Sequence, residues 1–260
     1  MGRKPLVGIS LKIYQNKIAE AVNYAQSISQ LTNGETDLEL FILPSMGVIY
    51  PVAQALHNRE NVIGLGAQNI APIANGALTG EFSIESLVDL QGHYVEIGHY
   101  ERRTYFHEDN ELINQKIQLT LKNQLVPLLC IGEAQQTTGA ELKTVFKKIL
   151  AADLANISPA QLATLIIAYE PYWAIGKAAA AQASYVAVAH TMIREALAEL
   201  IGPTADNVRI IYGGSVSKDT AGSLVNNPNV DGVFVGRFGH DPQNFAEIVK
   251  IVKQVKLQAN

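Results

Sequence analysis

Eight short runs of apolar, β-forming residues recur along the chain, on average about 32 residues apart, and a stretch with helical spacing follows each of them. The runs span 5–10, 38–44, 61–67, 93–98, 125–132, 164–170, 207–214 and 231–236. Most are continuously apolar rather than alternating, which is typical of parallel strands buried on both faces. Since a strand and its crossover helix need about 30 residues, eight such units predict an α/β protein with a single (β/α)8 barrel.

Two of the intervening stretches show clear helical periodicity. Residues 17–31 place apolar side chains on one helical face, namely Ile18, Ala21, Val22, Ala25, Ile28 and Leu31. Residues 140–154 do the same with Leu142, Val145, Phe146, Ile149 and Leu150. Helix starts are indicated at Ser158-Pro159 and at Asp241-Pro242, because a capping side chain followed by proline is typical of a helix N-terminus.

The chain shows no linker, low-complexity segment or break in composition. We therefore expect residues 1–260 to form one domain. Six or seven units instead of eight would give an open, doubly wound sheet, so the strand count decides between the two architectures. A GxGxxG turn is absent after the first run, which disfavours the dinucleotide-binding form of such a sheet.

Composition and charge exclude several classes of protein. With 48% hydrophobic and 17% charged residues, the chain has the balance of an ordinary globular protein. A net charge of −4 and the lack of a basic cluster argue against nucleic acid as a partner. The one cysteine, Cys130, rules out an internal disulfide, and its apolar neighbours predict a core position. No run approaches the roughly 18 apolar residues of a membrane span, and no leader pattern is found, so we expect no membrane partner and a cytoplasmic location.

Polar residues and glycines follow the strand-like runs where each run ends. Lys12 follows the first run, His99 the fourth, Ser215 the seventh, and Glu170 ends the sixth, while Gly236-Arg237 closes the eighth. The carboxyl ends of barrel strands meet at one rim, so we expect these residues to lie around one pocket. Glycine-rich turns after the last two strands are typical of phosphate-binding sites, because they expose backbone N–H groups.

This combination suits proton transfer next to a carbonyl group. A carboxylate at Glu170 would remove a carbon-bound proton, the imidazole of His99 would polarise the oxygen, and the ammonium of Lys12 would stabilise the enediolate. Such chemistry needs no metal and no cofactor, and we expect neither. Two alternatives remain open: a Schiff-base aldolase using Lys12 or Lys177, and a barrel that binds a sugar phosphate without turning it over.

Six motifs, in order and at compatible spacing, resemble the triosephosphate isomerase family over nearly the whole chain. They are GAQN (66–69), LTGE (78–81), EIGHYERR (96–103), LLCIGE (128–133), AYEPYWAIG (168–176) and YGGSV (212–216). The resemblance implies that Glu170 is the base, His99 the electrophile and Lys12 the cation. It implies phosphate contacts to the backbone at Gly176, Ser215 and Gly236, and a lid over residues 171–181. It also implies a homodimer, in which a loop over about 68–81, with Gln68, Asn69 and Thr79, reaches the neighbouring subunit.

Four departures from the family pattern bear on the site. Ser10 stands where the family has Asn, which we expect to widen the pocket floor. The lid reads Gly176-Lys177-Ala178-Ala179-Ala180 instead of Gly-Thr-Gly-Lys. Arg237 replaces a second glycine and either contacts the phosphate or points to solvent. Tyr100 replaces a serine and is bulky enough to obstruct the resting position of the base, while the next residue, Glu101, is expected to orient Lys12.

Taken together, these departures resemble the branch of the family that acts on erythrulose phosphates. The favoured substrate is therefore a four-carbon ketose phosphate, converted from L-erythrulose 1-phosphate to D-erythrulose 4-phosphate. The alternative is the family's triose reaction, from D-glyceraldehyde 3-phosphate to dihydroxyacetone phosphate. Both reactions form an enediol between neighbouring carbons of a small phosphorylated sugar.

Overall fold

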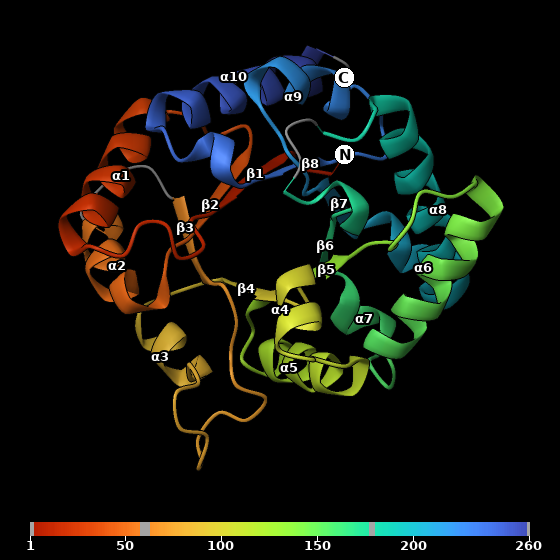
Figure 1. Cartoon of the computed structure of the whole chain (residues 1–260), viewed down its shortest axis with the longest axis horizontal. Coiled ribbons are helices and arrows are strands. Elements are labelled where there is room, and N and C mark those ends of the chain that lie inside the picture. Colours follow the sequence, from red (N-terminus) through yellow and green to blue (C-terminus); the bar gives the residue numbers. More distant parts are fainter. Residues whose placement is uncertain (1–2, 58–62, 177–179, 259–260) are drawn as a thin grey trace.

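The chain folds into a closed barrel of eight parallel strands, in which each strand pairs with the next and β1 pairs with β8 (Figure 1). The computed structural model describes residues 3–57, 63–176 and 180–258. The strands are β1 (Leu6–Ser10), β2 (Glu39–Leu43), β3 (Ile63–Ala67), β4 (Tyr94–Ile97), β5 (Val126–Ile131), β6 (Ile166–Tyr169), β7 (Arg209–Tyr212) and β8 (Gly232–Val235). The predicted (β/α)8 barrel is confirmed, and the open-sheet alternative is wrong.

Helices form a ring around the strands (Figure 1). The α-helices are α1 (Ile18–Leu31), α2 (Ile49–His57), α3 (Ile84–Asp89), α4 (Tyr100–Tyr105), α5 (Asn110–Lys122), α6 (Gly139–Asp153), α7 (Pro159–Leu162), α8 (Ala183–Ile201), α9 (Lys218–Val225) and α10 (Pro242–Gln258). Short 3-10 turns are η1 (Met46–Val48), η2 (Tyr172–Ala174), η3 (Gly202–Asp206) and η4 (Arg237–Gly239). In the parts of the chain described above, we find no helix that is both long and apolar enough to cross a membrane.

The predicted helical faces are largely confirmed. In α6, Leu142, Phe146 and Leu150 are buried as expected. In α1 the buried stripe begins one turn later than predicted, because Ile18 is the first helical residue and is 60% exposed. Tyr24, which the periodicity did not single out, lies in the buried stripe instead.

Both predicted helix starts are present. Ser158 caps α7, whose first residue is Pro159, and it forms a reciprocal capping box with Gln161. The Asp241 side chain accepts the backbone N–H of Gln243 at 2.8 Å at the start of α10. These caps satisfy N–H groups that a helix N-terminus leaves without an internal partner.

Side chains fill the inside of the barrel, so the barrel is a packed core and not a channel. The Phe41 ring stacks on Tyr94 with 4.7 Å between centroids and on Phe234 with 5.6 Å. Gly8 faces the Phe41 ring so closely that a Cβ atom there would overlap it. Since side chains alternate along a strand, Glu96 lies on the same face of β4 as the interior residue Tyr94. A ligand must therefore bind at the mouth, above this aromatic layer.

Several predicted strands are longer than the observed ones at the carboxyl end. The predicted run 93–98 ends as a strand at Ile97, and the run 207–214 ends at Tyr212. Gly98 and the pair Gly213-Gly214 thus lie in turns at the mouth of the barrel. Gly98 has a φ of +73°, a backbone conformation that favours glycine.

Candidate active site

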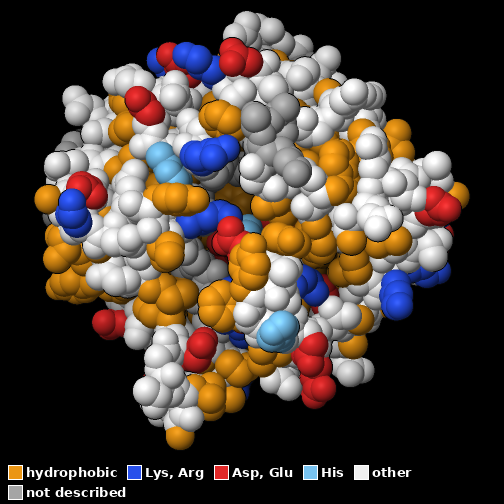
Figure 2. Space-filling view, viewed as in Figure 1, with side chains coloured by type: hydrophobic (Ala, Val, Ile, Leu, Met, Phe, Trp, Pro, Cys, Tyr) orange, Lys and Arg blue, Asp and Glu red, His pale blue; other side chains and the backbone are white. Residues whose placement is uncertain are grey.

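A pocket opens at the carboxyl ends of the strands, where charged side chains of both signs gather at a hollow in the centre of this face (Figure 2). Nine of the ten predicted site residues line it, namely Ser10, Lys12, His99, Glu101, Glu170, Gly176, Ser215, Gly236 and Arg237. The tenth, Tyr100, does not line it. The structure thus brings together groups that are up to 227 positions apart in the chain, from Ser10 to Arg237.

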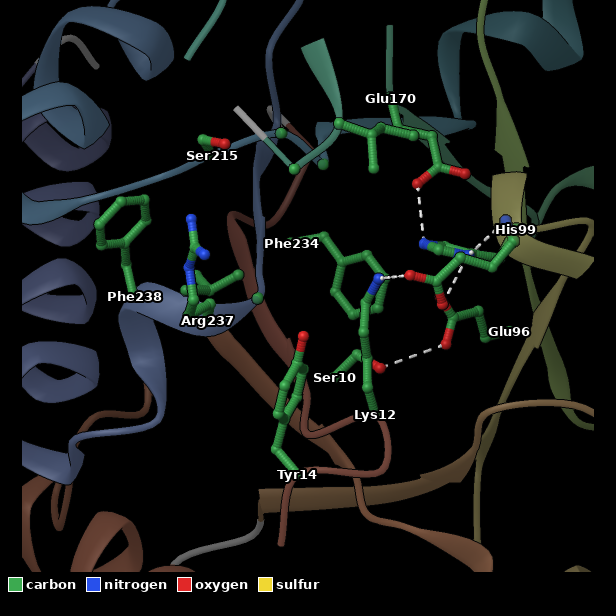
Figure 3. Close-up of a pocket in the computed structure, with 17 residues that line it drawn as sticks. Ser10, Lys12, Tyr14, Glu96, His99, Glu170, Ser215, Phe234, Arg237 and Phe238 are labelled. Carbon is green, nitrogen blue, oxygen red and sulfur yellow. Dashed lines mark hydrogen bonds and ion pairs between the residues drawn. The ribbon is translucent and has the colours of Figure 1, made fainter. Parts of the chain in front are cut away.

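Glu170 and His99 lie next to each other at one side of the pocket (Figure 3). Glu170 directly follows β6, is 3% exposed, and its Oε2 lies 3.2 Å from Nε2 of His99. Its other oxygen, Oε1, accepts the backbone N–H of Tyr100 at 2.8 Å. The pair therefore places a buried carboxylate next to an imidazole, which is a suitable arrangement for moving a proton at a bound ligand.

The prediction that the Tyr100 side chain obstructs the base, Glu170, is wrong. Its backbone N–H binds the Glu170 carboxylate, and its ring turns away to pack 5.1 Å from the ring of Tyr172 and 6.4 Å from that of Tyr105. A bulky side chain is tolerated because the residue contributes to the site through its backbone, and the backbone is the same for any residue except proline.

The backbone around Glu170 is held by its neighbour strand. The Glu170 N–H donates to the carbonyl of Ile131 at 2.9 Å. Gly132, the next residue, lies so close that a Cβ atom there would overlap the carbonyl oxygen of Glu170. A glycine is therefore needed at position 132 to let the end of β6 approach β5.

His99 caps helix α4 with its own ring. Its Nδ1 accepts the backbone N–H of Glu101 at 3.1 Å, which fixes the ring orientation. Burial lowers the pKa of His99, but the Glu170 carboxylate outweighs this and raises the pKa to about 9. That value favours a charged ring, whereas a nitrogen that accepts an N–H cannot carry a proton. Because Nδ1 accepts this hydrogen bond, the ring is neutral and carries its proton on Nε2, directed at Glu170 and the pocket.

Lys12 is held in place from two directions. Its Nζ donates to Oε1 of Glu101 at 2.5 Å, as expected, and its backbone carbonyl accepts from Gln68 at 2.9 Å. Lys12 has a φ of +45°, which is uncommon for a residue other than glycine and is typical of residues that a functional site holds in strained positions. Burial lowers the pKa of the Lys12 amine, but Glu101 outweighs this effect, so the pKa lies above its ordinary value.

The environment of Lys12 disfavours the Schiff-base alternative. A nucleophilic lysine has to lose its proton, and enzymes achieve this by lowering its pKa. The Glu101 carboxylate stabilises the ammonium form instead. Lys177, the second lysine considered for that chemistry, lies outside the described residues, as do Ala178 and Ala179 of the predicted lid.

The other side of the pocket is built from glycines and short turns. Gly176, Gly213, Gly214, Ser215 and Gly236 line it, and Gly176 has a φ of +73°. Turns of this kind direct backbone N–H groups towards an anion. Arg237 also lines the pocket, with its Cζ 5.6 Å from the centroid of the Phe238 ring. Arg237 is at the same time exposed to solvent, so both of its predicted roles are compatible with this position.

Sequence reasoning missed five residues that line the pocket, namely Tyr14, Glu96, Phe234, Val235 and Phe238. Glu96 is the most informative, because it is a carboxylate in a strand that is otherwise apolar and is only 4% exposed. Burial raises its pKa to about 7, and the Glu170 carboxylate acts in the same direction, while the Lys12 ammonium opposes both. A single acidic residue in the run 93–98 is the signal that could have found it.

The loop after β3 supports the site from within the same chain. Gln68 donates to the backbone carbonyls of Lys12 and Leu43, and Asn69 accepts from the buried Lys116 at 2.9 Å. Thr79, further along this loop, is exposed. The first two residues of the loop thus have an intrachain role that does not depend on a partner.

Comparison of the sequence with known proteins identifies relatives over nearly the whole chain. The family model described as "Triosephosphate isomerase" matches residues 5–252. The chain is 47% identical over 255 residues to "Probable triosephosphate isomerase 2" of Listeria monocytogenes serotype 4b (strain F2365), covering 98% of this chain and 99% of the relative. It is 37% identical over 250 residues to "Triosephosphate isomerase" of Citrifermentans bemidjiense, covering 95% and 98%.

A third relative, "Triosephosphate isomerase" of Chloroflexus aurantiacus, is 36% identical over 249 residues, which cover 95% of this chain and 98% of the relative. All these matches run over nearly the full length of both chains. They agree with the closed barrel and with the residues gathered at its mouth. The chain therefore belongs to the triosephosphate isomerase family of aldose–ketose isomerases.

Proposed function

We propose that this protein isomerises a small phosphorylated sugar by moving a proton between neighbouring carbons through an enediolate. The observation that carries the proposal is the 3.2 Å approach of His99 Nε2 to Glu170 Oε2 inside a pocket that Lys12 also lines. Glu170 removes the proton from carbon and returns it to the neighbouring carbon. His99 donates to the substrate oxygen from Nε2, and the Lys12 ammonium stabilises the negative charge that develops there.

The phosphate group binds at the glycine-rich side of the pocket. Backbone N–H groups at Gly176, Ser215 and Gly236 are the proposed ligands, and the Arg237 guanidinium adds a positive charge beside them. Residues 171–181 act as a lid over this group, which excludes water from the enediolate. With the phosphate fixed, the carbonyl of a small sugar falls between His99 and Lys12.

For the substrate, we propose a four-carbon ketose phosphate, converted from L-erythrulose 1-phosphate to D-erythrulose 4-phosphate. Two features support the larger sugar: the short side chain of Ser10 at the pocket floor and the polar side chain of Glu96 beside it. The names of the relatives from Citrifermentans bemidjiense and Chloroflexus aurantiacus support the alternative, which is the triose reaction. Both substrates use the same acid–base groups.

We also propose that the protein is a homodimer. Large apolar side chains are exposed on the loops and at the end of helix α4 around the mouth, among them Ile13, Tyr14, Ile73, Tyr105 and Phe106. Ile13 is 77% exposed although it directly follows Lys12. Burial of such side chains against a second copy would stabilise an assembly and fix the loop that carries the lysine. Analytical ultracentrifugation at micromolar concentration tests this, with a species of twice the chain mass expected.

A side-by-side rate comparison tests the substrate. We expect a higher kcat/KM for L-erythrulose 1-phosphate than for dihydroxyacetone phosphate, each followed by NMR through appearance of its isomer. A preference for dihydroxyacetone phosphate would replace the four-carbon substrate with the triose. Saturable binding of both sugars without turnover of either would contradict the isomerase proposal as a whole.

A further inference from the structure

A carboxylate lies at the floor of the pocket among apolar residues. Glu96 points into the barrel from β4, where its neighbours include Cys130 of the adjacent strand β5 and, across the barrel, Phe234 of β8. Charged residues are rarely fully buried without a partner, because burial removes their hydration. The 4% exposure of Glu96 therefore calls for a reason.

The contacts of Glu96 leave much of its hydrogen-bonding capacity unused. Ser10 Oγ donates to Oε2 at 3.5 Å, and the Cys130 thiol lies 3.9 Å from Oε1. Both contacts are long, whereas a carboxylate has about four acceptor positions. Among the described residues, no ion pair involves Glu96, whereas the nearby Glu101 pairs with Lys12. A ligand with a hydroxyl group could therefore be received here without displacing a strong internal bond.

The position of Glu96 in the pocket matters as much as its contacts. Figure 3 shows Ser215 and Arg237 on one side of the pocket, His99 and Glu96 on the opposite side, and Ser10 between Arg237 and Glu96. A ligand whose phosphate binds beside Ser215 and whose carbonyl faces His99 extends across the pocket, so its far end comes to the side where Glu96 lies. The two polar groups there are the Ser10 hydroxyl and the Glu96 carboxyl group.

We propose that Ser10 and Glu96 form a subsite for the terminal hydroxymethyl group of the substrate, in which Glu96 and the Ser10 hydroxyl share hydrogen bonds with the substrate hydroxyl. The inference rests on the proposed function and identifies what selects a four-carbon sugar. L-erythrulose 1-phosphate carries the same phosphate, carbonyl and reacting carbon as dihydroxyacetone phosphate. It differs by one hydroxymethyl group on that carbon, at the end remote from the phosphate.

A smaller substrate would leave this pair without its ligand. Dihydroxyacetone phosphate ends before the floor, so the polar groups there would stay without their partner or hold water. A site built to bind a hydroxyl discriminates against an analogue that lacks it, because buried polar groups are left unpaired. The subsite therefore acts on the ratio of the two rates and not on the proton transfer itself.

The test compares the two sugars in wild-type enzyme, Ser10→Ala and Glu96→Leu. We expect the ratio of kcat/KM for L-erythrulose 1-phosphate to that for dihydroxyacetone phosphate to fall about tenfold or more in each variant. Ser29→Ala, at an equally buried serine of α1 outside the pocket, serves as the control and should keep the wild-type ratio. Since both sugars are measured on the same preparation, partial misfolding lowers both rates and leaves the ratio unchanged.

Three measurements distinguish a failure of the subsite from a failure of the proposed substrate. Wild-type ratios in both Ser10→Ala and Glu96→Leu overturn the subsite while the proposed substrate stands. A wild-type enzyme that prefers dihydroxyacetone phosphate overturns the substrate proposal and the subsite with it. Inhibition by 2-phosphoglycolate, which has a phosphate but no hydroxymethyl group, should be the same in all folded variants. If Glu96→Leu does not fold, Glu96→Gln keeps the shape and should lower the ratio by a smaller factor.

Discussion

The Glu170 carboxylate uses both of its oxygens inside the pocket, one 3.2 Å from Nε2 of His99 and the other 2.8 Å from the backbone N of Tyr100. To act on a substrate carbon, the carboxylate has to leave at least one of these partners. The chain continues from Glu170 directly into residues 171–176, so a movement of this segment and a movement of the base are coupled by the covalent chain.

Shortening the base tests its role. We expect Glu170→Asp to lower kcat by about a hundredfold or more with little change in KM, because a displacement of about 1 Å is enough to misalign a proton transfer. Steady-state kinetics on the preferred sugar phosphate measure this. Glu111→Asp, at an exposed carboxylate of α5, is the control with wild-type rates. Turnover near the wild-type level in Glu170→Asp would show that this carboxylate is not the base.

Removing the ammonium at Lys12 tests charge stabilisation. We expect Lys12→Met to lower kcat/KM by at least about a hundredfold, since loss of one preorganised group that stabilises a developing oxyanion has effects of that size. Borohydride added to wild-type enzyme with substrate should leave Lys12 unmodified in peptide mass spectra. A reduced sugar adduct on Lys12 would support the Schiff-base aldolase instead.

Crowding the end of β6 tests how the base is positioned. Gly132→Ala puts a methyl group where the Glu170 carbonyl oxygen lies, so we expect a lower kcat and a loss of about 1–3 kcal/mol in unfolding free energy. Kinetics and urea unfolding measure the two effects. Gly47→Ala is the matched control, because a Cβ atom there meets no other atom within 4 Å. Equal kinetics for the two variants would mean that this close approach does not position Glu170.

The buried carboxyl group of Glu96 predicts a pH-dependent stability. Its pKa is raised from 4.5 to about 7 by burial, so between these pH values the folded protein keeps a proton that the unfolded chain releases. Stability therefore falls as pH rises through this window, by up to about 3 kcal/mol relative to Glu96→Gln, which does not titrate. Urea unfolding at pH 5, 6, 7 and 8 measures the difference. A constant difference between the two proteins would contradict the raised pKa.

Much of the fold could be predicted because its signals are local. Each strand is buried on both faces, so a run such as 125–132 is apolar at nearly every position and is visible without its neighbours. Strand boundaries are predicted less accurately: the apolar run 207–214 includes Gly213-Gly214, although both residues lie in the turn that follows β7. The predicted burial of Ile18 is wrong for a similar reason, since periodicity does not reveal where a helix first meets the barrel.

The candidate site could be predicted as far as it depends on residue type at a strand end, as for Lys12, His99 and Glu170. Two features were beyond that reasoning. Tyr100 contributes a backbone N–H, which is independent of its side chain. Glu96 faces the pocket only because the barrel closes and brings β4 across from β1 and β8, and that juxtaposition is a property of the tertiary structure.

Deuterium incorporation tests the central claim most directly. The enzyme is incubated in deuterated water with L-erythrulose 1-phosphate or dihydroxyacetone phosphate, and the recovered sugars are examined by NMR. An enediolate formed by Glu170 requires deuterium to enter the carbon next to the carbonyl, at a rate that falls by about a hundredfold or more in Glu170→Asp. Saturable binding of the sugar phosphates with no deuterium at any carbon would contradict the account.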